Sequence, residues 1–311
     1  MKQLEGKTIL VTGASGFIGA HLAKRLARIA GIKLLLLSRQ IQQSNQPNVR
    51  WLNEDLRHLK SAYWDSHNIS RIDYIFHLGA FTPKRAAEAN QTDRAIEDNI
   101  LATQRLLESV PGKPRKILFA STVDVYSSAS SEEVMTEQSE VRSSSVYGAS
   151  KLFCESLVSA WAKEKRVDCA LLRYGHIYGP GEEKYQKLIP TVIRNLAANQ
   201  APLVHGDGSA LRDFLYVDDA VEATLRASVF EGSVGPVNIV RSESASLKEV
   251  VSLLIRLMKS DKKIEFLRDK PNGASFRFDS TLMEKLLGNW PKVGLEQGLA
   301  VEVASFRGEI A

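Results

Sequence analysis

The chain has 311 residues, of which 44% are hydrophobic and 25% charged, and a formal net charge of +5. This composition is typical of a globular protein, and no run approaches the roughly 18–20 apolar residues that a membrane-spanning helix needs. The basic residues form no cluster of five or six, so a small anionic partner explains the charge as well as nucleic acid would. Two cysteines are too few for a disulfide framework, and the polar start is unlike a signal peptide, so we expect a cytoplasmic protein that neither enters a membrane nor binds nucleic acid.

Short apolar strands alternate with helical patterns through the first 173 residues. The expected strands are Thr8–Thr12, Lys33–Leu37, Asp73–Leu78, Lys116–Ala120 and Cys169–Arg173, and the expected helices are Phe17–Ala30, Arg94–Ser109 and Gly148–Lys165. Continuously apolar strands that alternate with helices form parallel sheets covered on both faces. The pattern therefore predicts an α/β, doubly wound (Rossmann) fold.

Beyond Arg173 the alternation breaks at the turn cluster 178–181. Sheet-like material returns as a strand at Phe214–Val217, a helix at Asp218–Ser228 and a strand at Val237–Val240, and helices follow at Leu247–Met258 and Thr281–Leu287. We therefore predict a first domain of residues 1–173, to which 214–240 return. Residues 174–213 and 241–311 would form a smaller, interleaved C-terminal α/β lobe, and Ser127–Ser145 a surface loop.

Gly13, Gly16 and Gly19 lie between the first strand and the first helix. In that context one glycine permits a tight turn, one lets the backbone approach a pyrophosphate, and one lets the helix pack closely on the sheet. The helix N-terminus adds free N–H groups and a partial positive charge. A purely structural turn is the alternative, but the context predicts a dinucleotide site. Its contacts would include Gly13, Ser15, Gly16, Phe17, Ile18 and Gly19.

The second strand ends at Leu37-Ser38-Arg39, without the acidic residue that usually binds the ribose 2′-hydroxyl of NAD. Arg39 supplies a cation suited to a 2′-phosphate, so NADP is favoured over NAD. A solvated loop charge is the alternative for Arg39. Asp55, followed by Leu56, comes after a third strand and can accept a hydrogen bond from the adenine amino group.

Tyr147 and Lys151 are four residues apart at the start of a helix and therefore share one face. A free phenol has a pKa near 10, and a nearby ammonium together with a positive nicotinamide ring would lower it. Tyr147 can then accept a hydroxyl proton as hydride leaves the same carbon. Thr122 ends the fifth strand at its carboxyl edge, where open α/β sheets bind ligands, and can orient the substrate oxygen.

Together, these residues match the pattern of a known family. The chain resembles the extended short-chain dehydrogenase/reductase superfamily, in its NAD(P)-dependent nucleotide-sugar epimerase/dehydratase branch. The segments that carry the resemblance are Thr12–Gly19, Asp55-Leu56, His77–Ala80, Asn99, Ser121–Tyr126, Tyr147–Lys151, Arg173–Pro180, Arg212–Phe214 and Val217–Asp219.

The resemblance implies roles for individual residues. Tyr147 would be the acid/base, Lys151 would hold the nicotinamide ribose, and Thr122 would complete the triad. Leu78, Gly79 and Ala80 would line the cofactor, and Thr82, Thr122, His176 and Arg212 would contact a nucleoside-diphosphate sugar. Packing of the helices Arg94–Ser109 and Gly148–Lys165 against a second copy would make a homodimer.

Three departures from the family pattern bear on the reaction. Sugar 4,6-dehydratases carry an Asp-Glu pair after the catalytic hydroxyl, where this chain has Val123-Asp124. Valine cannot donate a proton, so dehydration is disfavoured, although Asp124 remains a candidate acid/base or a loop aspartate bonded to backbone. His176 replaces a common asparagine, and it can contact substrate, transfer a proton or simply pack.

We expect an epimerase that acts at C4 and passes through a transient keto sugar without net redox change. The main alternative is an NADPH-dependent reductase of a 4-keto sugar, which Arg39 and the missing dehydratase pair both suit. A non-enzymatic dinucleotide sensor is the remote alternative, because fold alone does not establish activity. The six histidines show no spacing typical of a metal site, so no metal is expected.

Overall fold

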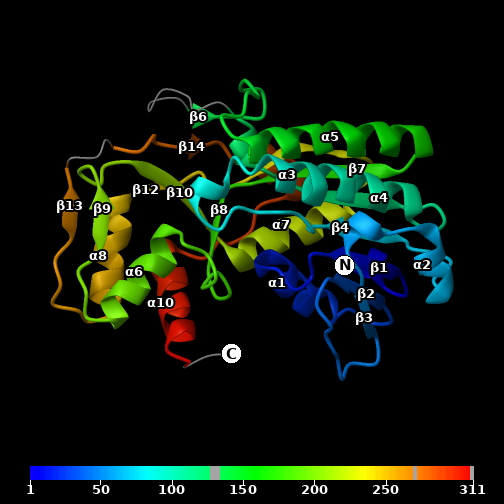
Figure 1. Ribbon diagram of the computed structural model, residues 1–311, viewed down its shortest axis with the longest axis horizontal. Coiled ribbons are helices and arrows are strands. Elements are labelled where there is room, and N and C mark those ends of the chain that lie inside the picture. The colour runs from blue at the N-terminus through cyan, green and yellow to red at the C-terminus, as the bar shows by residue number, and fades with distance from the viewer. Residues whose placement is uncertain (127–133, 269–271, 309–311) are drawn as a thin grey trace.

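A seven-stranded parallel sheet organises the chain (Figure 1). The structure is a computed structural model that describes residues 1–126, 134–268 and 272–308. The strands run in the spatial order β11–β7–β5–β4–β1–β2–β3. Their bounds are β1 (Thr8–Thr12), β2 (Lys33–Ser38), β3 (Val49–Asn53), β4 (Tyr74–His77), β5 (Lys116–Thr122), β7 (Asp168–Tyr174) and β11 (Val234–Ile239). This order starts at β1 and turns back between β1 and β4, as in a doubly wound dinucleotide fold.

Helices cover both faces of this sheet because its strands are apolar on both sides. They are α1 (Phe17–Leu26), α2 (Ser61–Ser66), α3 (Thr92–Ala95), α4 (Ala102–Ser109), α5 (Val146–Lys165) and α7 (Val217–Val229). Figure 1 shows α1 and α7 on one side of the sheet and α3, α4 and α5 on the other. Side chains alternate along a strand, so Ile9 and Val11 pack in one core with Leu22 of α1, while Leu10 packs in the other with Val158 of α5. The predicted Rossmann fold is confirmed.

The start of α5 is fixed by local chemistry. The side chain of Ser145 accepts a hydrogen bond from the backbone N–H of Gly148 at 3.0 Å, which caps the helix, and the chain leaves α5 through Arg166 in the left-handed conformation (φ 53°). The predicted helix Arg94–Ser109 is present as α3 and α4, joined by a π-helical stretch, Ile96–Leu101. The first helix α1 ends at Leu26, four residues before the predicted Ala30, in a series of turns.

The remaining elements form a smaller lobe beside the sheet, at the left of Figure 1. A three-stranded sheet joins β12 (Ser244–Ser246), β10 (Leu211–Tyr216) and β8 (His176–Tyr178), and two-stranded sheets pair β9 (Leu203–His205) with β13 (Glu265–Leu267) and β6 (Val134–Met135) with β14 (Arg277–Phe278). The helices of this part are α6 (Leu188–Ala197), α8 (Leu247–Leu257), α9 (Thr281–Leu287) and α10 (Leu295–Phe306). No helix in the described ranges is long and apolar enough to cross a membrane.

Two expectations about this region need correction. The strand expected at Phe214–Val217 does not return to the large sheet, because β10 pairs with β8 in register Phe214↔His176; only α7 and β11 return. The expected loop Ser127–Ser145 contains the short strand β6, which pairs with β14, while its residues 127–133 lie outside the described part of the chain.

Candidate functional site

The carboxyl ends of β1 and β4 form the crevice in which doubly wound sheets bind ligands. Gly13 follows β1 with φ +68°, and a Cβ atom added to it would lie 2.7 Å from the backbone of Leu78 and Gly79. A Cβ on Gly19 would lie 2.1 Å from the carbonyl oxygen of Gly13. Only glycine fits at either position, so the turn expected to bind the cofactor packs as tightly as its sequence predicts.

A hydrogen-bond chain fixes the floor of this crevice. The Thr12 hydroxyl accepts from the backbone N–H of Gly79 at 3.0 Å and therefore donates to Nδ1 of His77 at 2.7 Å. His77 is left to donate through Nε2 to Thr103 at 3.0 Å. Burial lowers the pKa of His77 to about 3, so its ring is neutral and serves to position the loop that contains Gly79.

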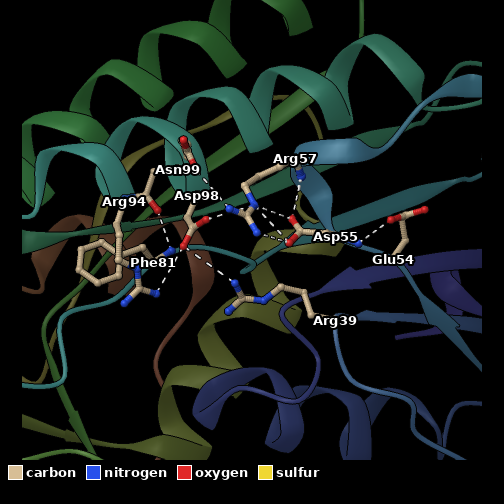
Figure 2. A network of polar contacts seen from close by, with 9 residues as sticks. Arg39, Glu54, Asp55, Arg57, Phe81, Arg94, Asp98 and Asn99 are labelled. Atoms are coloured by element: carbon tan, nitrogen blue, oxygen red, sulfur yellow. Dashed lines mark hydrogen bonds and ion pairs between the residues drawn. The ribbon is translucent and has the colours of Figure 1, made fainter.

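Arg39 belongs to a cluster of charges at the outer end of the crevice, shown in Figure 2. The carboxylate of Asp98 is largely buried and forms ion pairs with Arg39 at 3.9 Å, Arg57 at 3.5 Å and Arg94 at 3.4 Å. Arg57 also donates to Asp55 through Nη2 at 2.7 Å and lowers the pKa of that carboxyl. The side chain of Arg39 remains 59% exposed. The expected cofactor contacts Arg39 and Asp55 therefore lie in one cluster, in which both are already engaged by opposite charges.

Tyr147 lies at the centre of the predicted catalytic group. Its phenol is buried, and both Thr82 and Thr122 hydrogen-bond to it. The pKa of Tyr147 is nevertheless raised above its usual value, first by burial and then by the neighbouring charge of Asp124. The sequence predicts that Lys151 lowers the pKa of Tyr147, but Lys151 is not among the described groups that shift this pKa in the structure. In this environment the phenol is held in its protonated form.

Lys151 is 3% exposed and lies over the ring of Phe119, with Nζ 4.2 Å from the ring centre. Burial lowers the pKa of its ammonium to about 8. Asn99 supports the same helix turn, because it donates to Ser150 at 2.8 Å and accepts from the backbone N–H of Phe81 at 2.7 Å. The helix face that carries Lys151 is thereby tied to the loop after β4.

Asp124 follows Thr122 in a short helical turn, and its backbone N–H donates to the Thr122 hydroxyl at 3.2 Å. Asp124 is exposed, yet enough atoms surround it for desolvation to raise the pKa of its carboxyl, which Lys187 partly offsets. Val123 beside it is buried in a small apolar cluster, so only one of the two positions presents an acid to the site.

His176 and Arg212 lie together on neighbouring strands and share the ring of Phe276. The ring centres of His176 and Phe276 are 6.0 Å apart, and the guanidinium of Arg212 lies 4.8 Å from the same ring. Arg212 donates to the carbonyls of Leu211 and Ala274. Burial, with the charges of Arg212 and Lys187, lowers the pKa of His176 to about 3, and its Nδ1 has no partner among the described residues.

Sequence reasoning missed two residues of this region, Tyr185 and Lys187. Lys187 acts electrostatically on both Asp124 and His176, and Tyr185 acts on Tyr147. Lys187 occupies the N-cap position of α6, far along the chain from β5. Only the tertiary fold therefore brings it near the carboxyl end of β5. No local sequence pattern identifies either residue as part of the site, because their segment has the composition of an ordinary polar loop. In the described ranges no group of three or more metal-ligating side chains occurs.

Comparison with known proteins gives this geometry a family. A model of the NAD dependent epimerase/dehydratase family matches residues 9–239, from β1 to the end of β11. The chain belongs to that family. The chain is 30% identical over 94% of its length to a trifunctional UDP-glucose 4,6-dehydratase/UDP-4-keto-6-deoxy-D-glucose 3,5-epimerase/UDP-4-keto-L-rhamnose-reductase of Arabidopsis thaliana, of which it covers 46%. The expected superfamily resemblance is confirmed.

Two further relatives match this chain over nearly the full length of both proteins. A UDP-N-acetyl-alpha-D-glucosaminuronate decarboxylase of Bacillus cytotoxicus is 28% identical, with 97% of this chain and 98% of the relative covered. The crystal structure of a UDP-glucuronic acid 4-epimerase from Bacillus cereus, in complex with UDP-glucuronic acid and NAD, superposes with a TM-score of 0.84 at 26% identity, covering 97% and 100% of the two chains. By contrast, the chain spans about half the length of the Arabidopsis and Dictyostelium relatives it matches.

Proposed function

We propose that the protein is an NAD(P)-dependent epimerase of a nucleoside-diphosphate sugar, with Tyr147 as its acid/base. The observation that carries the proposal is the group around one phenol. Thr82 and Thr122 hydrogen-bond to Tyr147, and Asp124 lies beside it, all at the carboxyl edge of the sheet. The similarity to the UDP-glucuronic acid 4-epimerase of Bacillus cereus supports the reaction class.

Different residues of the chain would carry out proton transfer and substrate binding. Tyr147 would take a proton from a sugar hydroxyl and return it, and Thr122 and Thr82 would hold the reacting oxygen. Lys187 and Arg212 would hold the diphosphate as cations, and the Nδ1 of the neutral His176, unpartnered among the described residues, would accept a hydrogen bond from a hydroxyl of the ligand.

The glycine turn fits a dinucleotide, because Gly13 and Gly19 leave no room for side chains and the start of α1 offers free N–H groups. Residues 13–19, Leu56 and 78–80 would line it, and Lys151 would hold its ribose. A bound nicotinamide would supply a reversible hydride acceptor. We propose NADP over NAD because Arg39 replaces an acid, although Asp98 already neutralises part of its charge.

The test is turnover of a panel of UDP-, dTDP-, GDP- and CDP-sugars, followed by NMR of the sugar and by absorbance of the reduced nicotinamide. Epimerisation gives a new sugar diastereomer with no net change in that absorbance. A panel in which no sugar changes configuration would refute the proposal.

Reduction of a 4-keto sugar is the second candidate, and a specific observation favours it. The raised pKa of Tyr147 keeps the phenol protonated, which suits a group that donates a proton to a new alkoxide. Stoichiometric loss of NADPH absorbance with a keto sugar would identify the reductase and exclude simple epimerisation. Dehydration remains disfavoured, because the buried Val123 supplies no acid.

We further propose a homodimer that packs the α3–α4 and α5 helices of two copies together. Ile96, Leu101 and Phe153 lie on these helices and are 43%, 41% and 54% exposed. Large apolar side chains that gather on one face indicate an interaction surface. Light scattering should give twice the chain mass for the wild type and the monomer mass for Phe153→Glu, with Ile41→Glu, on an exposed loop elsewhere, as the control. A monomeric wild type would refute the dimer.

A further inference from the structure

Residues 179–187, here called the 179–187 segment, connect β8 to α6 across the mouth of the candidate site. The carbonyl of Pro180 lies 2.7 Å from Nε2 of His21 on α1. The backbone N–H of Gln186 donates to the carbonyl of Lys84 at 2.8 Å, and Arg194 of α6 donates to the carbonyl of Glu183 at 2.8 Å. The segment therefore bridges the cofactor helix, the loop after β4 and the smaller lobe.

This segment also brings side chains to the site. The ring of Tyr185 lies 6.4 Å from that of Phe17, the first residue of α1 after the glycine turn. Lys187 acts on both Asp124 and His176. If the segment moved away, the site would lose the positive charge of Lys187 that acts on Asp124. It would also lose the ring of Tyr185 beside Phe17.

A pair of buried carboxyl groups ties the segment to α10. Glu182 is 1% exposed and Glu302 of α10 is 0% exposed, and the two carboxyl groups lie close enough for each to act electrostatically on the other. Three of their four oxygens have no hydrogen-bond partner among the described residues. The helix itself is held close, because Gly298 packs so tightly under Tyr178 that a Cβ there would lie 2.1 Å from the phenol oxygen.

Two carboxylates this close and this deeply buried, with no cation of the described residues hydrogen-bonded to either of them, cannot both be charged. The titratable groups that face the pair are Lys187, Glu183 and Tyr185 on the segment, Tyr178 on β8 and Tyr216 on β10. Lys187 is the one cation among them, and it is exposed. Burial raises the pKa of Glu182 to about 7 and that of Glu302 well above its usual value.

We propose that Glu182 and Glu302 form a proton-sharing latch, which holds the 179–187 segment against α10 and keeps the mouth of the site closed. A proton between the two carboxyls satisfies oxygens that no other donor reaches. When the protons are lost, two like charges face each other in a dry environment. The segment then separates from α10 so that water can reach them.

The sign of the pH effect follows from linkage. In the open segment a glutamate returns to its ordinary pKa of 4.5, whereas in the closed segment that of Glu182 is about 7. Between these values opening releases at least one proton, so the opening equilibrium rises at least about tenfold per pH unit. The closed state is therefore favoured at low pH and weakened as the pH rises towards 7.

Hydrogen exchange of the ligand-free protein tests the latch without any substrate, so its outcome is independent of the proposed function. Amides of residues 179–187 are followed from pH 5 to 7, with exchange rates corrected for the chemical pH dependence. The wild type should show at least about tenfold more opening per pH unit. In the Glu182→Gln, Glu302→Gln double variant two neutral amides replace the protonated pair, and opening should not depend on pH.

Glu296→Gln is the matched control, since Glu296 lies on α10 but is exposed and pairs with Arg256 at 2.7 Å. It should behave as the wild type. Glu302→Gln alone should reduce the pH dependence, because an amide donor stabilises the remaining carboxylate. Opening in the wild type that is constant over this pH range would overturn the latch, whatever the variants do. An unchanged pH dependence in a folded double variant would overturn it as well.

Discussion

Asp98 should weaken the preference of the protein for NADP, and Asp98→Asn should strengthen it. Arg39 is the cation available for a 2′-phosphate, but its Nη1 lies 3.9 Å from an Asp98 oxygen. A phosphate bound to Arg39 would share that guanidinium with a carboxylate of the same sign. The Asp98→Asn substitution removes this repulsion and leaves Arg57 paired with Asp55 and Glu97.

The magnitude follows from the distance. Two unit charges about 4 Å apart interact by about 1 kcal/mol in surroundings as polar as water, and a phosphate monoester carries about 1.5 to 2 charges at neutral pH. A phosphate held on the other side of the guanidinium would lie about twice that distance from Asp98, so removing the Asp98 charge should favour NADP by about 0.8–1 kcal/mol, or roughly 4- to 5-fold in Kd. NAD presents a neutral hydroxyl there, so its Kd should change less than about twofold.

Isothermal titration of NADP and NAD at two salt concentrations measures both affinities. Glu97→Gln is the matched control, because Glu97 pairs with Arg57 at 3.2 Å, whereas Arg39 pairs with Asp98. Arg39→Ala should remove most of the NADP preference. The reasoning fails if the wild type binds the two cofactors equally, or if Asp98→Asn leaves the ratio of affinities unchanged.

Three other substitutions address the site and its support. Tyr147→Phe should reduce turnover by about 10²–10⁴-fold, the usual contribution of a general acid/base, while cofactor binding measured by fluorescence survives; robust turnover would contradict the assignment. His176→Asn should raise KM and leave the pH profile of kcat unchanged from pH 5 to 8, since a pKa of about 3 keeps the ring neutral there. A wild-type limb near pH 6.5 that disappears in this variant would show that His176 transfers a proton. Arg173→Met should lower the free energy of unfolding by about 3–5 kcal/mol, because it leaves the buried Glu155 unpaired. Urea unfolding measures this, the exposed Arg105→Ala should cost less than about 1 kcal/mol, and equal losses would refute the argument.

The parts of the site that the sequence predicted are those that depend on neighbouring residues. The glycine turn needs only the strand before it and the helix after it, and the pair Tyr147 and Lys151 needs only a helix. Thr122 was placed correctly at the end of a strand because the apolar run before it is continuous. Each of these inferences used contacts that helical or strand geometry alone defines.

Other features depend on contacts across the fold, and local patterns do not contain them. β10 looks like a strand of the large sheet, but its partner β8 lies 35 residues earlier in the chain, and only pairing decides the sheet. The pKa of Tyr147 moved opposite to the expectation because burial, which no spacing reveals, outweighs the nearby hydrogen bonds. Glu182 and Glu302 are 120 residues apart, and each alone reads as a surface charge.

The distribution of charge in the site supports a ligand with a neutral reacting part and an anionic handle. The phenol, Asp124 beside it and His176 on β8 are neutral or held towards neutrality, because burial raises the pKa of Tyr147 and Asp124 and lowers that of His176. Cations stand further out, at Lys187 and Arg212. A sugar carbon needs no charge partner, whereas a diphosphate needs cations that remain accessible to it. Under the proposed function, this separation would let the cations bind the diphosphate without changing the charge around the phenol.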